Sequence, residues 1–147
     1  MGLREDLGPG PVALDTAPFI YFIEEHPEFV PLVAPVFEDV AAGRREVATS
    51  GLTLLEVLAV PYRAANLALA ERYEALLTRS RGVRLVEIGR AELRMAAQLR
   101  AVHPSVRTPD ALQLAAALSA GCSAFVTNDR DLPALPGLRI LKLRDYL

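Results

Sequence analysis

Residues 108–129 read TPDALQLAAALSAGCSAFVTND, an apolar stretch with charged side chains only near its two ends. Pro109 is typical of the first position of a helix, and Gly121 is typical of a helix end, where a left-handed backbone is common. The short apolar run at 124–127 predicts a buried strand. Residues 121–123 interrupt the uncharged stretch, so we interpret it as a helix followed by a strand and not as a membrane span.

The same alternation of strand-like and helix-like patterns extends along the rest of the chain. Strands that alternate with helices form βαβ units, which build a parallel sheet with helices on both faces. We therefore predict one domain of the α/β class, a three-layer α/β/α fold around a five-stranded parallel sheet. The predicted strands span 12–14, 46–49, 84–88, 124–127 and 138–141, and the predicted helices span 18–25, 28–42, 50–60, 61–79, 90–102 and 109–121.

The composition indicates a protein of the reducing cytoplasm. The chain has 147 residues, enough to bury one core, and 52% of them are hydrophobic. Its single cysteine, Cys122, excludes an intrachain disulfide. Residues 1–11 hold no apolar run of signal-peptide length, so we expect no export. We interpret this segment as a leader, disordered or marking an alternative start, ahead of a domain that spans 12–147.

The charges are distributed unevenly. A net charge of −2 argues against a strongly basic nucleic-acid-binding protein. However, residues 1–60 hold three basic and ten acidic side chains, whereas residues 61–107 hold nine arginines and four glutamates. A basic segment beside an acidic pocket could grip a phosphate backbone. The alternative is that these arginines are solvated helix faces, which is the commoner explanation of charge runs.

Four acidic residues stand at or near the predicted turns between strands and helices. Asp15 follows the first strand directly, Asp129 follows the fourth strand by two residues, and Glu56 lies in the helix after the second strand. Ligands of open parallel sheets bind beyond the carboxyl ends of the strands, so these three acids should share one edge. Asp110 lies at the start of the helix that leads into the fourth strand. Local patterns do not decide whether the start of this helix lies at the same edge as the other three acids.

Each acid also has a purely structural interpretation. Asp15 could cap a helix, and Thr53 with Glu56 fits a capping box. Asp110 would favour the dipole of its helix, and Asp129 could belong to an ordinary turn. However, these motifs lie in apolar segments, where a carboxylate is costly unless it is paired, protonated or bound to a metal.

Matching cations are scarce in the sequence. Lys142 is the only lysine, and Arg130 is the only arginine within these motifs. A divalent cation would resolve the repulsion between close carboxylates, and all-oxygen ligands favour Mg²⁺ or Mn²⁺. Zinc would require histidine or cysteine, and His26, His103 and Cys122 show no ligand spacing. We interpret the histidines as surface or capping residues and the cysteine as a core residue.

A carboxylate site of this kind favours phosphodiester hydrolysis, because a bound cation activates water and stabilises a leaving oxygen. Cleavage through the RNA 2′-hydroxyl would instead need a general acid–base pair, often two histidines, for which the chain offers little. A haloacid-dehalogenase-like phosphatase is a rival reading. It would need an acid where Ala17 stands, and a lysine, for which only Lys142 is available.

At these motifs the sequence resembles the PIN-domain family, in particular its VapC-type toxins. The resemblance covers essentially residues 12–146, and four motifs occur in order: 14–16 with 19–21, 53–57, 108–115 and 126–132. It implies a five-stranded parallel sheet and an acidic Mg²⁺ or Mn²⁺ site. It also implies endoribonuclease activity on RNA, a homodimer and a small antitoxin partner. It places Asp110 at the same edge as the other acids.

Carried over residue by residue, the resemblance makes four acids both catalytic and metal-binding: Asp15, Glu56, Asp110 and Asp129. Thr127 and Asn128 would shape the loop, and Asp131 would be an auxiliary acid, although Leu132 replaces the aromatic residue often found after it. The apolar helices within 28–80 are our expected partner and dimer surfaces. A non-catalytic PIN-like module that binds RNA or protein is the main alternative, and the complete set of acids argues against it.

Overall fold

The computed structural model describes residues 2–129 and 131–147 and contains one five-stranded sheet, in the order β3-β2-β1-β4-β5. All neighbouring strands pair in parallel. The predicted α/β class and parallel sheet are therefore confirmed, with strand ends within two residues of their predicted positions. The strands are β1 (Val12–Leu14), β2 (Val47–Ser50), β3 (Val83–Val86), β4 (Ala124–Thr127) and β5 (Arg139–Lys142).

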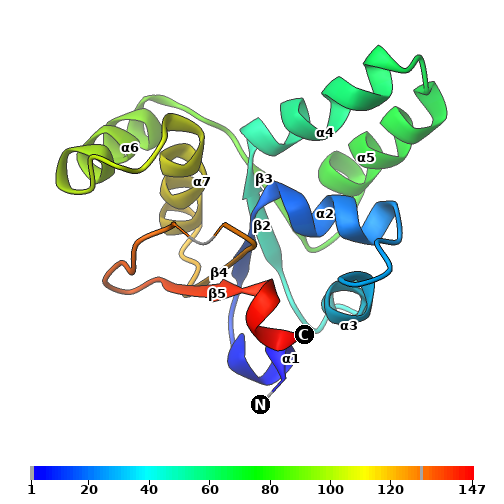
Figure 1. The fold of residues 1–147 in the computed structure, drawn as a ribbon, viewed down its shortest axis with the longest axis horizontal. Helices are drawn as coiled ribbons and strands as arrows, with labels where there is room; N and C mark the ends of the chain where they lie inside the picture. The colour runs from blue at the N-terminus through cyan, green and yellow to red at the C-terminus, as the bar shows by residue number, and fades with distance from the viewer. Residues whose placement is uncertain (1, 130) are drawn as a thin grey trace.

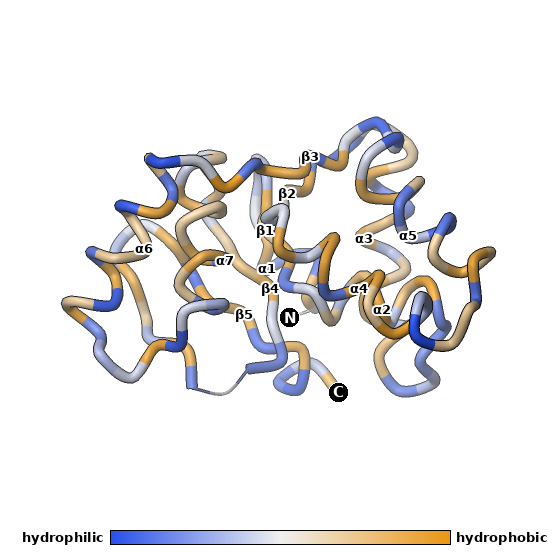
Figure 2. Tube along the Cα trace, turned by 90° about the horizontal axis from the view of Figure 1, so that it is seen from above, coloured by the Kyte–Doolittle hydropathy of each residue, from blue (hydrophilic) through white to orange (hydrophobic). Residues whose placement is uncertain are grey.

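Helices cover both faces of the sheet (Figure 1). In the described residues they are α1 (Leu3–Asp6), α2 (Thr16–Ile23), α3 (Val30–Ala41), α4 (Gly51–Arg63), α5 (Leu67–Arg79), α6 (Arg90–Val102), α7 (Thr108–Ser119) and a final 3₁₀ helix, η1 (Leu143–Tyr146). One core lies among α1 to α5 and the sheet, and a second lies between the sheet and the pair α6 and α7. This is the predicted three-layer arrangement. Hydrophobic residues predominate along α2 and α4, whereas hydrophilic and hydrophobic residues alternate along α6 (Figure 2).

The central strands are apolar because both of their faces are buried. Val12 and Leu14 of β1 point into the first core, and Ala13 between them points into the second, as expected when successive side chains alternate across a sheet. Phe125 of β4 likewise faces the second core. The carboxyl ends of β1 and β4 therefore lie side by side in the middle of the molecule, where the Asp15 amide donates to the Val126 carbonyl at 2.9 Å.

The helix expected to start at Pro61 begins six residues later. Pro61 is the third-last residue of α4, which continues to Arg63, and α5 starts after Asn66. Proline is tolerated here because only the last turn loses a backbone hydrogen bond. The chain reverses at Ala65, whose φ is 54°, and the Asn66 side chain caps α5 by accepting from the Leu69 amide at 3.2 Å.

The segment expected to be a leader packs against the domain. Leu3 and Leu7 are buried in the first core. The Arg4 guanidinium donates to the buried Asp39 carboxylate of α3, with Nε 2.8 Å from Oδ2, and holds the pKa of that carboxyl well below its usual range. The Arg139 guanidinium also donates to the Leu7 carbonyl at 2.9 Å. Burial of the two leucines, the Arg4–Asp39 ion pair and the Arg139 hydrogen bond all favour an ordered segment.

Across the described residues, no helix has both the length and the apolar character needed to cross a membrane. The stretch at 108–129 forms α7 and β4, separated by a turn at Gly121, whose φ is 73°. Its division into a helix and a strand is as predicted.

Candidate functional site

The four acids singled out in the sequence line one cavity of about 400 Å³ at the carboxyl edge of the sheet. Asp110 is among them, although local patterns left its direction open. Only a short turn joins α7 to β4, so α7 runs back along the sheet and its first turn returns to the edge where β4 ends. The cavity is lined by Asp15, Thr16, Ala17, Ile20, Glu56, Arg107, Pro109, Asp110, Gln113 and Asp129.

Asp15 is held from two sides. It is the N-cap of α2, and its Oδ1 accepts from the Thr16 amide at 2.8 Å. Its Oδ2 accepts from the Thr127 hydroxyl of β4, also at 2.8 Å. Burial raises the pKa of Asp15, these two hydrogen bonds lower it, and the nearby carboxylates of Asp110 and Glu56 raise it further. The capping interpretation is thus correct, and it leaves the carboxylate facing the other acids.

Thr127 connects two of the acids. Its hydroxyl donates to Asp15 and accepts from the Asp129 amide at 2.9 Å, and the residue is fully buried. The Asp129 carboxylate in turn accepts from the Asp131 amide at 2.9 Å. The loop after β4 is therefore folded around its own polar side chains. Asp131 is exposed and lines a neighbouring cavity together with Asp110 and Asp129.

Glu56 does not take part in a capping box. Ser50 caps α4 by accepting from the Leu52 amide at 3.1 Å, and Thr53 is buried beneath the helix. Glu56 lies one turn further along and is exposed, and its Oε1 accepts from the Thr16 hydroxyl at 2.7 Å. This hydrogen bond brings the carboxylate toward Asp15, because Thr16 is the next residue in the chain.

Asp110 is paired with the arginine that precedes its helix. Arg107 Nε lies 3.2 Å from Asp110 Oδ2. Burial raises the pKa of Asp110 and so does the charge of Asp129, whereas Arg107 lowers it. An exposed ion pair of this kind contributes about 0–1 kcal/mol, which is too little to offset a cluster of four carboxylates.

These carboxylates have the right chemistry for a divalent cation. All donors are hard oxygens, which suit Mg²⁺ or Mn²⁺. Within residues 2–129 and 131–147, however, no three His, Cys, Asp or Glu side chains are arranged so that they could hold a metal ion. Each acid is instead turned toward a nearby donor, as expected when like charges repel one another. The chemistry of the four acids therefore fits a divalent cation, whereas their arrangement in this structure does not form a metal site.

The PIN domain family model matches residues 12–138. The chain belongs to the PIN-domain family. A comparison with curated protein sequences gave no match. The sequence resemblance to this family is thus confirmed over the segment that carries all four acids.

Solved structures share the PIN fold over nearly the whole chain. VapBC-5 of Mycobacterium tuberculosis, from the VapBC family of toxin–antitoxin systems, is 26% identical with a TM-score of 0.57, covering 91% of this chain and 99% of that one. DNA-bound VapBC from Salmonella typhimurium is 23% identical, with a TM-score of 0.61 and coverages of 92% and 99%. Mycobacterium tuberculosis VapC20, described as a toxin that cleaves the sarcin–ricin loop, is 17% identical, with a TM-score of 0.66 and coverages of 82% and 91%.

A buried hydrogen-bond network beneath the acids of this PIN domain was missed by sequence reasoning. Gln113 of α7 is buried, and its Nε2 lies 2.9 Å from Thr53 Oγ1 and 3.2 Å from Thr16 Oγ1. Thr53 also shares a 2.7 Å hydrogen bond with Thr49 of β2. The network ties together α2, which Asp15 caps, and the helices α4 and α7, which carry Glu56 and Asp110. The available signal was a glutamine in the middle of an apolar helix, since a buried amide requires partners.

The remaining predicted polar residues have local roles. Asn128 joins the loop after β4 to two other elements: its Nδ2 donates to the Tyr21 hydroxyl at 2.9 Å, and its Oδ1 accepts from the Arg144 amide at 3.2 Å. His26 Nδ1 accepts from the Glu28 amide at 3.2 Å, as expected for a capping residue. Burial raises the pKa of the Cys122 thiol to about 11, which is typical of an unreactive core cysteine.

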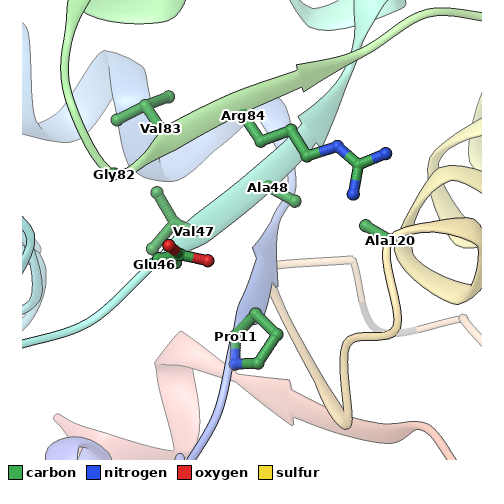
Figure 3. Close-up of a pocket in the computed structure, with 8 residues that line it drawn as sticks. All are labelled: Pro11, Glu46, Val47, Ala48, Gly82, Val83, Arg84 and Ala120. Carbon is green, nitrogen blue, oxygen red and sulfur yellow. The ribbon is translucent and has the colours of Figure 1, made fainter.

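Another cavity, of about 230 Å³, lies at the opposite, amino edge of the sheet (Figure 3). Its charged lining residues are Glu46 and Arg84, and the Arg84 side chain extends toward Ala120. The rest of the lining is small or apolar. A lining with one carboxylate and one guanidinium creates no need for a metal, so the carboxyl edge is the better candidate for chemistry.

Proposed function

We propose that this PIN domain is a metal-dependent endoribonuclease that hydrolyses RNA phosphodiester bonds. The observation that carries the proposal is the convergence of Asp15, Glu56, Asp110 and Asp129 on one cavity. Arg107 is the one cationic side chain of the described residues in the lining of that cavity. The family membership and the toxin structures that share the fold support it, including one described as cleaving the sarcin–ricin loop.

In this proposal the four acids hold Mg²⁺ or Mn²⁺, and the bound cation supplies an activated water and charge stabilisation at phosphorus. The chain's own residues position the acids. Thr127 fixes the orientation of Asp15 and the start of the Asp129 loop, and Thr16 draws Glu56 toward them. Asp131 is an auxiliary acid beside the same site. The apolar residues Ala17 and Ile20 form part of the cavity wall.

Metal removal tests the proposal. Single-stranded RNA should be cleaved with Mg²⁺ or Mn²⁺, and excess EDTA should abolish cleavage until the cation is restored. Hydrolysis by water leaves no 2′,3′-cyclic phosphate, whereas attack by the 2′-hydroxyl does, so the product ends are a second readout. Cleavage that persists in EDTA, or cyclic phosphate ends, would contradict a metal-dependent hydrolysis. A folded protein that binds RNA without cutting it would be a non-catalytic PIN-like module.

We further propose that the protein is the toxin of a type II toxin–antitoxin pair, acting in the cytoplasm as a homodimer with a small antitoxin. Large apolar side chains are exposed on α4 and α5, including Leu55 at 65% and Leu67 at 68%. Such a surface fits an apolar partner helix or a second copy of the chain. Induced expression should arrest growth, and co-expression of the antitoxin should relieve the arrest. Normal growth during high expression of active nuclease would favour a housekeeping role.

A further inference from the structure

Arg107 is the one cation, among the residues that the structure describes, lining the acidic cavity. It also lines the neighbouring cavity of about 390 Å³, together with Asp110, Asp129 and Asp131. The guanidinium therefore stands at the boundary between two cavities whose shared wall carries Asp110 and Asp129. A polyanion that approaches these carboxylates is repelled by all of them, and Arg107 is the lining group that attracts it.

We propose that Arg107 exchanges partners: it pairs with Asp110 while the acids lack a divalent cation, and binds an RNA phosphate once that cation occupies the site. This inference rests on the proposed nuclease function. Arginine is suited to the second role because its planar guanidinium can bind two phosphate oxygens at once. The cation and the guanidinium compete for the same Asp110 carboxylate, so binding of one weakens the hold of the other.

The geometry of the pair makes the exchange inexpensive. The two side chains are joined by an Nε–Oδ2 hydrogen bond of 3.2 Å, and the Arg107 side chain is 76% exposed against 15% for Asp110. The carboxylate is thus fixed in the wall, whereas the guanidinium is free to swing into solvent. Exposed pairs of this kind change an equilibrium constant by about five-fold or less.

The start of α7 does not depend on this side chain. Arg107 precedes the helix with an extended backbone, and its carbonyl accepts the first helical hydrogen bond from the Ala111 amide at 2.9 Å. The Arg107 side chain makes no capping hydrogen bond to the helix. An alanine at this position should therefore leave α7 in place, which allows the role in binding to be tested separately from folding.

The test compares Arg107→Ala with Arg81→Ala, which removes the same charge from an exposed arginine just before β3, at the opposite edge of the sheet. Mn²⁺ titration by calorimetry without RNA should show binding about two- to five-fold tighter in Arg107→Ala, because its competitor is gone. With saturating Mn²⁺, kcat/KM on single-stranded RNA should fall about ten-fold, and its logarithmic dependence on salt should become shallower by about 0.7. Arg81→Ala should change neither quantity.

Partner exchange predicts that Arg107→Ala strengthens Mn²⁺ binding and weakens RNA cleavage. A purely structural role of Arg107 would instead weaken both Mn²⁺ binding and RNA cleavage, or change neither. Arg107→Lys should restore the salt dependence with only part of the activity, because lysine keeps the charge and loses the planar fork. Unchanged or weaker Mn²⁺ binding in Arg107→Ala, or an unchanged salt dependence, would overturn the proposal. If the wild type does not cleave RNA, the proposed function fails, while the Mn²⁺ titration still decides whether Arg107 competes for Asp110.

Discussion

Asp15→Asn is expected to lower metal-dependent RNA cleavage by about a thousand-fold. Asp15 lies at the junction of β1 and β4, and its two oxygens are fixed by the Thr16 amide and the Thr127 hydroxyl. Asparagine keeps the size of the side chain and one acceptor oxygen but removes the charge that a divalent cation requires. Loss of a bound cation removes several kcal/mol of transition-state stabilisation, and about 1.4 kcal/mol corresponds to ten-fold in rate.

The measurement is the initial rate on a defined single-stranded RNA, with thermal unfolding in EDTA as the check on folding. Burial raises the pKa of Asp15, which means that the folded protein disfavours its charged form. Such a group reduces stability as pH rises through its raised pKa, so Asp15→Asn should not lower the unfolding temperature at neutral pH. The matched control is Asp145→Asn, an exposed acid in η1. Activity of Asp15→Asn within ten-fold of wild type would remove Asp15 from the site.

Thr127→Val is expected to lower the rate 10- to 100-fold although Thr127 is not itself a proposed metal ligand. Valine has nearly the same shape, but it cannot donate to Asp15 or accept from the Asp129 amide. Removing an outer group that orients metal ligands typically costs about 10- to 100-fold in affinity or activity. The half-buried Asp129 amide would also lose its acceptor, at a cost of about 0.5–1.5 kcal/mol in the free energy of unfolding.

Rescue by Thr127→Ser separates orientation from packing, because serine keeps the hydroxyl and removes a buried methyl group. We expect Thr127→Ser to recover most of the rate, and Thr127→Val to require more Mn²⁺ for half-maximal activity. Thr78→Val, at an exposed threonine of α5, serves as the isosteric control. Equal rates for Thr127→Val and wild type would show that the hydrogen bonds of Thr127 do not orient the acids.

The elements of this fold could be predicted because their signals are local. Alternating short apolar runs and helical patterns located all five strands of the sheet. The central strands β1 and β4 gave the clearest signal, because they are buried on both faces and are almost wholly apolar. Asp15, Glu56 and Asp129 could be assigned to one edge because each follows a strand of a parallel sheet. The boundary at Pro61 was wrong because proline favours the first turn of a helix, whereas Pro61 lies in the last turn of α4. The chain reversal at 64–66 gives only weak local signals.

What the sequence determined by itself was thus the order of strands and helices, the burial of the central strands and the edge at which three acids lie. These properties depend on hydrophobic periodicity and on chain direction, which are set by neighbouring residues. Local patterns left the placement of Asp110 open, and the family resemblance implied it. Only the tertiary structure decided the Gln113 network, the attachment of the N-terminal segment to α3, and the position of Arg107 between two cavities. Each depends on contacts between residues far apart in the chain, or on the path that brings α7 back to the site, and a local pattern carries no information about either.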